Sequence, residues 1–516
     1  MRLLLLLALA CATALAGEPA TPEPKTPQEE LDRGVELVKA KNYKDALVWF
    51  QRAADHGNAT AQHNLGILHF SGLGVDRDLD AAVQWFRKAA EKGQADAQTQ
   101  LAEMTFLGVG VPKDPQAGLK LLSQAADAGN AKAQMKLASL YRVGLDADGQ
   151  GVVPRDMSVF AGWILKAAEQ GSAEAQYQMG LVCQNGLGVR QDFSQAVQWF
   201  RKAADQDYAA AQYGFAQALL KGLGIVQNPK DALNWAKRSA DQGLADAQHL
   251  LGGMYRDGKG VEADAKLAVE WFKKAVEQGH VEAQYDLAML TLAGKGIDPD
   301  AKAAAELCRK AAEKGSANGQ QAYAIMLLNG HGVGIDQAQA FRWMFRAAEQ
   351  GLVSAEHNLG LMYLNGRGIA QDLKRAAECF RLATQHGNLD STVQYAVLLF
   401  KGQGVEKNEA QAYGLMRQAA DAGSAAAQTN VGIMLRDGTG VKANPAEAVT
   451  FFRKAAEQNW ADGQYALGYA YEQGQGTEKD LGQAKAWYEK AAVQGQGAAK
   501  AALEKLHAGT KGAPSP

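Results

Sequence analysis

Residues 172–207 read SAEAQYQMGLVCQNGLGVRQDFSQAVQWFRKAADQD, and this stretch decides the fold. Its first half places apolar residues at helical spacing and stops at Asn185-Gly186, a pair that commonly ends a helix. Its second half opens after a further glycine, and its apolar residues again share one helical stripe: Ala196, Trp199, Phe200 and Ala203. The stretch therefore predicts two antiparallel helices joined by a glycine-rich turn.

The same pattern recurs along the chain at a spacing of 36 residues, with one spacing of 42. Its last position falls at Gly57, Gly93, Gly129, Gly171, Asp207, Gly243, Gly279, Gly315, Gly351, Gly387, Gly423, Asn459 and Gly495. Residues 58–495 therefore hold twelve units, preceded by an incomplete unit over 31–57 and followed by a capping helix over 496–507. Because no helix pair can bury its apolar stripe alone, the units must stack on one another. The predicted fold is all-α, a right-handed α-solenoid of about twelve antiparallel helix pairs.

The first residues, MRLLLLLALACATALA, predict a secretory signal peptide over 1–16, with one positive charge, a short apolar core and a small-residue end. An alternative is a lipid anchor at Cys11, because the residues before it resemble a bacterial lipoprotein box. The chain is thus expected to be periplasmic or secreted, or else an outer-membrane lipoprotein. No later apolar run is long enough to span a membrane. Residues 17–30 are expected to form a proline-rich linker and 508–516 a disordered tail.

The charge balance gives no sign of a nucleic-acid partner. The chain has 54 basic and 56 acidic residues, a formal net charge of −2, and no long run of one sign. After signal cleavage three widely spaced cysteines remain, Cys183, Cys308 and Cys379, which fit small buried residues better than a disulfide framework or a metal site.

The repeated unit resembles the Sel-one-like repeat (SLR) family, which is related to the tetratricopeptide repeat. The matching residues in 244–279 are Ala247-Gln248, Leu251-Gly252, Tyr255, Gly258, Gly260-Val261, Ala268, Trp271-Phe272 and Gly279. The resemblance implies a scaffold that binds proteins or peptides and is often exported in bacteria. Some cysteine-rich relatives are linked to penicillin binding, which leaves an envelope protein that binds or hydrolyses cell-wall glycan or β-lactam as the alternative. This chain lacks the paired cysteines of those relatives.

Glycine-rich turns such as Gly186-Leu187-Gly188 allow two interpretations. At a helix N-terminus their N–H groups can bind a phosphate. As a hinge, the first glycine ends one helix in the left-handed conformation and the second lets the chain turn closely into the next. The hinge is favoured, because comparable turns recur in the other units, no strand precedes them and no phosphate-loop lysine follows.

The sequence contains no H-E-x-x-H, G-x-S-x-G or S-x-x-K motif, so no catalytic residue, cofactor or metal ligand is predicted and the chain is interpreted as a non-enzyme. Three histidines, His56, His63 and His69, crowd one region but suit ordinary polar or packing roles. The six-residue insertion holds Asp146, Asp148 and Gly149, which match part of a calcium loop. The third acidic position is missing and Met157 stands where the distal glutamate would fall, so a flexible surface loop is favoured.

The predicted binding surface follows the residue just after the glutamine of A-x-A-Q in each unit. If the array curves as tetratricopeptide solenoids do, this residue points into the concave surface. The tyrosines and histidines at this position, called here the Tyr/His column, are His63, Tyr177, Tyr213, His249, Tyr285, His357 and Tyr465. An acidic edge lies three residues earlier in the sequence and holds Asp96, Glu174, Asp246, Glu282, Asp390 and Asp462. The two together suit an extended peptide with basic residues.

The competing interpretation of this column is that its rings pack between neighbouring repeats. The second-helix tryptophans are expected to pack in the core: Trp85, Trp163, Trp199, Trp235, Trp271, Trp343 and Trp487.

Overall fold

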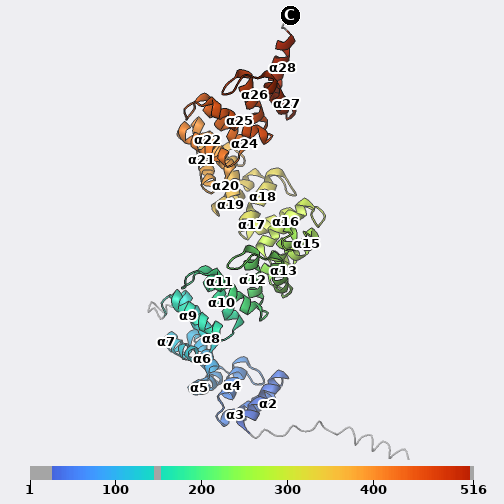
Figure 1. The fold of residues 1–516 in the computed structure, drawn as a ribbon. Helices are drawn as coiled ribbons and strands as arrows, with labels where there is room; N and C mark the ends of the chain where they lie inside the picture. Colours follow the sequence, from blue (N-terminus) through green and yellow to red (C-terminus); the bar gives the residue numbers. More distant parts are fainter. Residues whose placement is uncertain (1–25, 145–152, 512–516) are drawn as a thin grey trace, which may run out of the picture. The chain divides into compact units, whose positions relative to one another are not determined.

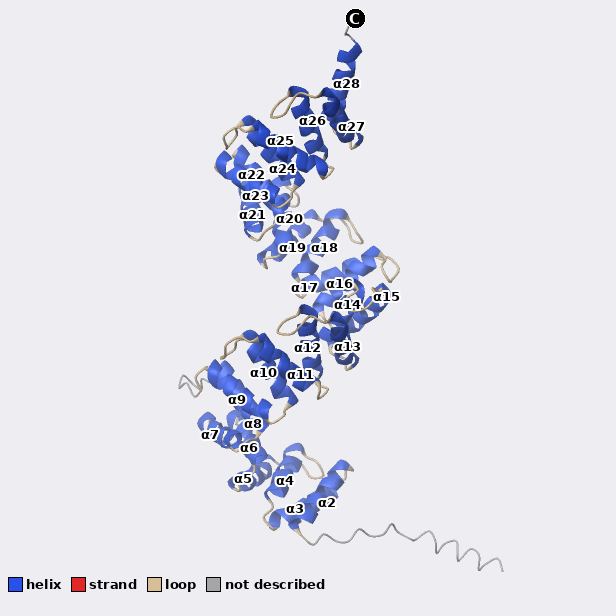
Figure 2. Ribbon diagram, viewed as in Figure 1, coloured by secondary structure: helices blue, strands red, loops and turns tan. Residues whose placement is uncertain are grey.

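The computed structural model describes residues 26–144 and 153–511, and every regular element within them is an α-helix (Figures 1 and 2). The chain divides into two compact units, residues 1–247 with 259–261 and residues 248–258 with 262–516. The prediction of an all-α solenoid made of antiparallel helix pairs is confirmed. None of the described helices combines the length and the apolar character that crossing a membrane requires.

The even-numbered helices are the first helices of the repeats, and the odd-numbered ones are the second helices. The first unit contains α2 (Pro27–Lys39), α3 (Tyr43–Asp55), α4 (Ala59–Ser71), α5 (Leu79–Glu91), α6 (Ala95–Leu107), α7 (Pro115–Asp127), α8 (Ala131–Val143), α9 (Met157–Glu169), α10 (Ala173–Asn185), α11 (Phe193–Ala204), α12 (Ala209–Lys221) and α13 (Pro229–Asp241). Helix α14 (Ala245–Asp257) contributes residues to both units.

The second unit continues with α15 (Ala265–Glu277), α16 (Val281–Ala293), α17 (Ala301–Glu313), α18 (Ala317–Asn329), α19 (Gln337–Glu349), α20 (Val353–Asn365), α21 (Leu373–Gln385), α22 (Leu389–Lys401), α23 (Glu409–Asp421), α24 (Ala425–Asp437), α25 (Pro445–Glu457), α26 (Ala461–Gln473), α27 (Leu481–Val493) and α28 (Gly497–Lys511).

The ends of the solenoid differ slightly from the predicted boundaries. Helix α2 begins at Pro27, inside the segment expected to be linker, because Thr26 and Glu29 form a capping box at its start. Helix α28 continues past residue 507 to Lys511. The predicted signal peptide with Cys11, the insertion with Asp146, Asp148 and Gly149, and residues 512–516 of the predicted tail lie outside the described residues.

Polar caps and glycines set the helix boundaries within each repeat. In residues 173–208 the side chain of Ser172 accepts a hydrogen bond from Ala175 N (3.3 Å), and Asp192 accepts one from Gln195 N (2.9 Å). Each cap satisfies a backbone N–H that the first helical turn leaves without a partner. Helix α10 is capped by Gly186, which adopts the left-handed conformation at φ 67° and donates its N–H to the carbonyl of Val182.

The second glycine of the turn has a different role. Gly188 also has positive φ (73°), and a Cβ built on it would overlap the carbonyl oxygen of Met157 in the preceding repeat. A side chain here would therefore separate two repeats whose backbones touch. The turn is the predicted hinge between helices, and its N–H groups at Gly186 and Leu187 are used by the carbonyl of Val182.

A buried glutamine near the start of most first helices links consecutive repeats. The Nε2 atom of Gln176 donates to the carbonyl oxygen of Ala168 in the preceding repeat (3.2 Å), and its Oε1 atom accepts from Gln206 Nε2 (2.8 Å). We call this arrangement the glutamine rung. The same side-chain pair occurs as Gln134–Gln170, Gln212–Gln242, Gln248–Gln278, Gln320–Gln350, Gln428–Gln458 and Gln464–Gln494.

One rung of the second unit is built from different side chains. Glu356 replaces the glutamine and is 6% exposed, and the ring Nδ1 of His386 lies 2.9 Å from its Oε2. Histidine thus stands where the partner glutamine stands in other repeats, so both members of the pair have changed together.

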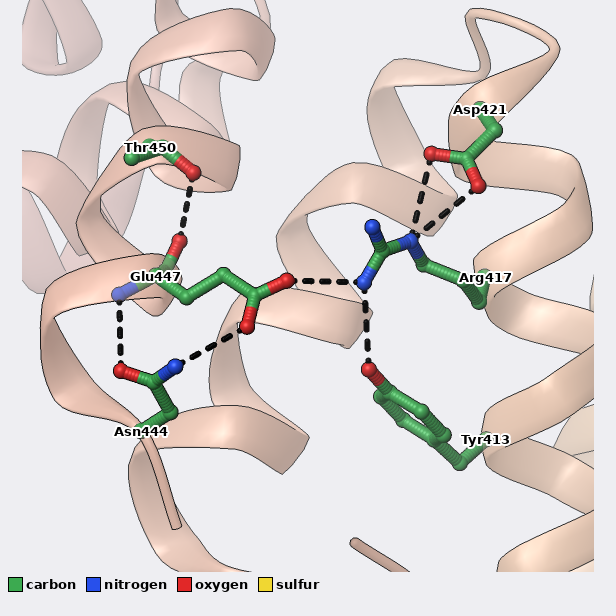
Figure 3. Close-up of polar contacts among 6 residues, drawn as sticks. All are labelled: Tyr413, Arg417, Asp421, Asn444, Glu447 and Thr450. Atoms are coloured by element: carbon green, nitrogen blue, oxygen red, sulfur yellow. Dashed lines mark hydrogen bonds and ion pairs between the residues drawn. The ribbon is translucent and has the colours of Figure 1, made fainter. Parts of the chain in front are cut away.

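Ion pairs on the second helices add contacts between repeats. In Figure 3 the Arg417 guanidinium of α23 lies between Asp421 of its own helix and Glu447 of α25, and it also donates to the Tyr413 hydroxyl. The Nη1–Oε1 distance to Glu447 is 2.8 Å.

The tryptophans predicted to be core residues are only half buried. Trp163, for example, packs against the core of the preceding repeat while its outer face carries the Lys166 ammonium 3.8 Å from the ring centroid. After Trp85, Trp199, Trp271 and Trp487 the next residue along the helix is a fully buried aromatic, such as Phe200, which is 1% exposed. One face of the indole thus packs at the repeat junction, and the other face makes a cation–π contact.

Candidate functional site

The Tyr/His column lies on the first helices, and each of its seven rings is half buried. Five of the rings rest on a buried aromatic side chain of the second helix in their own repeat. The ring-centroid distances are 5.7 Å for His63–Phe86, 5.8 Å for Tyr177–Phe200, 5.6 Å for His249–Phe272, 5.8 Å for His357–Phe380 and 5.6 Å for Tyr465–Tyr488. The supporting rings are at most 1% exposed. One face of each column ring is therefore fixed by the core while part of the ring stays open to solvent.

Tyr213 and Tyr285 are supported differently, because the equivalent second-helix positions hold the smaller Ala236 and Cys308. The Tyr213 hydroxyl accepts a hydrogen bond from Gln217 Nε2 at 2.6 Å. Burial, with smaller contributions from Asp246 and Tyr177, raises the pKa of Tyr213 to about 12. Burial also raises the pKa of Tyr285. Both phenols stay protonated at neutral pH and can donate or accept hydrogen bonds.

In the first unit the column forms a cluster of tyrosines with acids around it. The rings of Tyr177 and Tyr208 are 5.6 Å apart. The charge of Asp246 contributes to the raised pKa values of Tyr177 and Tyr213, and that of Glu174 to the pKa of Tyr208. Half-buried phenol rings and exposed carboxylates thus meet on one surface.

The second unit repeats this arrangement with histidines. The ring of His249 lies 4.5 Å from that of His280, and its Nε2 atom lies 2.8 Å from Oδ2 of Asp286. Asp286 also accepts from Arg256 Nη1 (2.7 Å). The carboxylate therefore already neutralises a cation, and this cluster offers less negative charge than the tyrosine cluster.

The remaining histidines of the column are His63 and His357. Burial lowers the pKa of His63 and of His357, so the neutral ring is favoured in both. His357 Nδ1 lies 2.8 Å from the buried hydroxyl of Ser391 in the next repeat.

Most of the predicted acidic edge is exposed: Asp96, Glu174, Asp246, Asp390 and Asp462, while Glu282 is half buried. Two of these acids are tied to the next repeat, Asp96 by Asn130 (2.9 Å) and Asp462 by Gln496 (3.2 Å). The edge is thus partly used to hold neighbouring repeats in register.

Sequence reasoning missed two ring contacts of this surface, Tyr208 and His280. Both stand at the N-cap of a first helix, where most other repeats have Asn, Ser or Gln. An aromatic ring in place of the usual polar N-cap residue is the sequence signal that identifies these two positions.

The histidines, acids and cysteines that the structure describes are the candidates for metal ligands and reactive thiols. No group of three or more His, Cys, Asp or Glu side chains among them could hold a metal ion. Burial raises the pKa of the Cys308 thiol to about 12 and that of Cys379 to about 11, which keeps both thiols protonated and poorly nucleophilic at neutral pH. His56 is engaged by Glu30 (2.9 Å) and does not join His63 and His69 in a cluster.

Comparison with known families finds the Sel1 repeat in thirteen segments of this chain between residues 31 and 496. The first of them, residues 31–58, is the segment expected to be an incomplete unit. A comparison with curated protein sequences finds no match.

Among solved structures, a protective antigen of uropathogenic Escherichia coli with an SLR fold is similar at 31% identity. The similarity covers 91% of this chain and 98% of the antigen, with a TM-score of 0.67. A Sel1 repeat protein from Oxalobacter formigenes is 29% identical over 68% of this chain and 99% of its own, with a TM-score of 0.48.

Proposed function

This chain belongs to the Sel1 repeat family, and we propose that it is an exported, non-enzymatic scaffold that holds partner proteins or peptides along the Tyr/His column. Sel1 repeat proteins are generally protein-interaction scaffolds. The observation that carries the proposal is the tyrosine cluster of the first unit, where Tyr177, Tyr208 and Tyr213 meet the carboxylates of Glu174 and Asp246.

The physical chemistry of that cluster suits a basic partner. Aromatic rings already fixed on one face lose little conformational freedom on binding, and tyrosine is over-represented among the residues that dominate interface energies. A lysine or arginine side chain over such a ring gains a cation–π contact, and nearby carboxylates attract it. We therefore expect an extended peptide with Lys or Arg residues to bind here.

Export is the second part of the proposal and rests on residues 1–16 with their apolar core and small-residue end. Intact-mass measurement of the protein purified from its native host distinguishes the two routes. A chain starting at Gly17 supports simple secretion, a lipidated Cys11 supports a membrane-tethered scaffold, and an uncleaved Met1 contradicts export.

The column is tested by replacing Tyr213 and Tyr285 with Ala together and measuring partner capture and melting temperature on the same preparation. Partners are identified in an envelope extract by mass spectrometry, and binding is then repeated with a synthetic peptide from the partner. Tyr255→Ala is the matched control, because Tyr255 is another half-buried first-helix tyrosine but lies outside the column. Weakened capture below the melting transition supports the proposal. A lower melting temperature with unchanged affinity would show that the column only packs repeats together.

A further inference from the structure

A pocket of about 550 Å³ opens in the first unit between α8, α9 and α10. Its floor is apolar and comes from Met135, Phe160 and Ile164, while Lys132 and Arg142 lie at its rim. Glu174 and Gln178 of α10 form the side next to the tyrosine cluster.

The pocket exists because three rings present in the next repeat are absent here. In residues 173–208 the positions of Tyr177, Phe200 and Tyr208 hold rings in mutual contact around Tyr177. The equivalent positions in 131–172 hold Met135, Ile164 and Ser172, all three of which line the pocket. Smaller and more flexible side chains leave open the space that rings fill one repeat later.

The charge at the rim is also opposite to that of the acidic edge. Lys132 is the one basic residue at its position in the twelve repeats. The same position is acidic at Asp96, Glu174, Asp246, Glu282, Asp390 and Asp462. A ligand that meets this repeat therefore encounters a cation where the rest of the edge offers carboxylates.

Two of the pocket's cations are available to a ligand. Lys136 forms an ion pair with Glu103. Within residues 26–144 and 153–511, neither Lys132 nor Arg142 has an ion-pair partner, and the Arg142 guanidinium lies 6.0 Å from the centroid of the Phe160 ring. Asp96, the nearest member of the acidic edge on the N-terminal side, accepts a hydrogen bond from Asn130.

The spacing of the two cations sets the length of the ligand. They lie ten residues apart on α8, which is about 15 Å of helix at 1.5 Å per residue. An extended peptide advances about 3.3 Å per residue, so carboxylates four residues apart span that distance. A side chain midway between them would lie over the apolar floor.

We propose that this pocket binds an acidic peptide segment in which one large apolar side chain stands between two carboxylates about four residues apart. The apolar side chain rests on Met135, Phe160 and Ile164, and the carboxylates face Lys132 and Arg142. The inference rests on the proposed scaffold function, because it gives the scaffold a second class of peptide partner beside the basic one.

The probe is a fluorescein-labelled peptide, acetyl-Gly-Glu-Ser-Leu-Ser-Glu-Gly-amide, whose binding to the full chain is measured by fluorescence polarisation. We expect at least tenfold weaker binding when both glutamates are Gln, or when the leucine is Ala. Binding should also weaken as salt is added, because partly exposed charges are screened.

Three protein variants complete the test. Lys132→Glu restores the acid of the neighbouring repeats and should weaken binding at least tenfold. A filled variant should abolish binding because it copies the ring arrangement of the next repeat. It combines Met135→Tyr, Ile164→Phe and Ser172→Tyr with Ala138→Gly, since Gly180 lies beneath the Phe200 ring in that repeat. Lys230→Glu makes the same charge change at an exposed residue of α13 and should have no effect. Melting curves confirm that each variant is folded.

Equal binding by wild type and Lys132→Glu, or retained binding by a folded filled variant, would overturn the proposal. A basic peptide of the same length, tested in parallel on the tyrosine cluster, separates the two hypotheses. Failure of the acidic probe with capture of the basic peptide removes the pocket alone, whereas failure of both also removes the scaffold function.

Discussion

The ring of Phe380 lies against the backbone of Gly360, so closely that a Cβ atom on Gly360 would stand 2.6 Å from Cε1 of the ring. The two positions vary together across the repeats. Glycine faces an aromatic ring in the pairs Gly34–Phe50, Gly66–Phe86, Gly180–Phe200, Gly252–Phe272, Gly360–Phe380, Gly432–Phe452 and Gly468–Tyr488. Alanine stands opposite a residue without such a ring in Ala102–Leu122, Ala138–Ile164, Ala216–Ala236, Ala288–Cys308, Ala324–Met344 and Ala396–Met416.

This complementarity predicts a rescue. Gly360→Ala should destabilise the protein by about 1–3 kcal/mol, because an added methyl group overpacks a filled core. Adding Phe380→Met, which copies the neighbouring Ala324–Met344 pair, should recover most of that loss. Chemical denaturation of the single and double variants measures both effects. Gly414→Ala is the control, since nothing lies near its Cβ position and an exposed helical glycine gains stability on becoming alanine. A double variant no more stable than Gly360→Ala would contradict the rescue.

The glutamine rung predicts a stabilising substitution. Oε1 of Gln98 is buried and has no hydrogen-bond partner among the described residues, and the position that supplies the partner in other repeats holds Ala128. Ala128 is the C-cap of α7, just as Gln242 is the C-cap of α13 and donates to Gln212. Ala128→Gln should therefore reach Gln98 and stabilise by about 0.5–1.5 kcal/mol. Thermal denaturation measures the gain. In a Gln98→Met background the same substitution should give none, and an equal gain there would show that the rung is not its source.

Tyr213 predicts a loss of stability at high pH. Its pKa is raised to about 12 from the ordinary value of 10.0, first by burial and then by Asp246 and Tyr177. The unfolded chain therefore releases this proton first, so the contribution of Tyr213 is present below pH 10 and is lost as pH rises toward 12. The melting temperatures of the wild type and of Tyr213→Phe are measured across this pH window. Equal slopes of melting temperature against pH would show that the pKa of Tyr213 is not raised. We expect the wild type to lose stability more steeply than the variant.

The Arg417–Glu447 pair predicts a small effect. Both side chains are about one-third exposed, at 37% and 34%, so water screens their attraction and the coupling should stay within about 1 kcal/mol. A double-mutant cycle with Arg417→Met and Glu447→Gln measures it, and high salt should reduce it. A coupling of several kcal/mol that salt leaves unchanged would mean that the pair is far better shielded than its exposure indicates.

The fold could be predicted from the sequence because its determinants are local and repeated. The glycine at 186 and the caps at Ser172 and Asp192 act on helix ends beside them in the sequence, and they recur with the period of the repeat. The tryptophans were predicted less well. A helical stripe shows that Trp199 and Phe200 are both apolar, but only the packing of adjacent repeats decides that the phenyl ring is buried and the indole half exposed.

The candidate surface was predictable in position but not in detail. The column residues share one register of the repeat, which sequence alone reveals. Tyr177 contacts Tyr208 at the N-cap of the next first helix, and His249 pairs with Asp286 on the next first helix. Both contacts depend on how successive first helices stack. The pocket at Met135 was missed because it arises from the absence of rings, which a search for aromatic residues passes over.

The glutamine rung has a consequence for how such arrays change during evolution. Its two side chains, such as Gln176 and Gln206, belong to one repeat, and its bond to the preceding repeat ends on a main-chain carbonyl, that of Ala168. A duplicated or deleted gene segment encoding one repeat would carry both partners, and a carbonyl is present whatever residue occupies the new neighbour. Even the Glu356–His386 pair would be inherited intact. This junction therefore demands no matching mutation across its boundary, which allows the array to lengthen or shorten by whole repeats in a single genetic event.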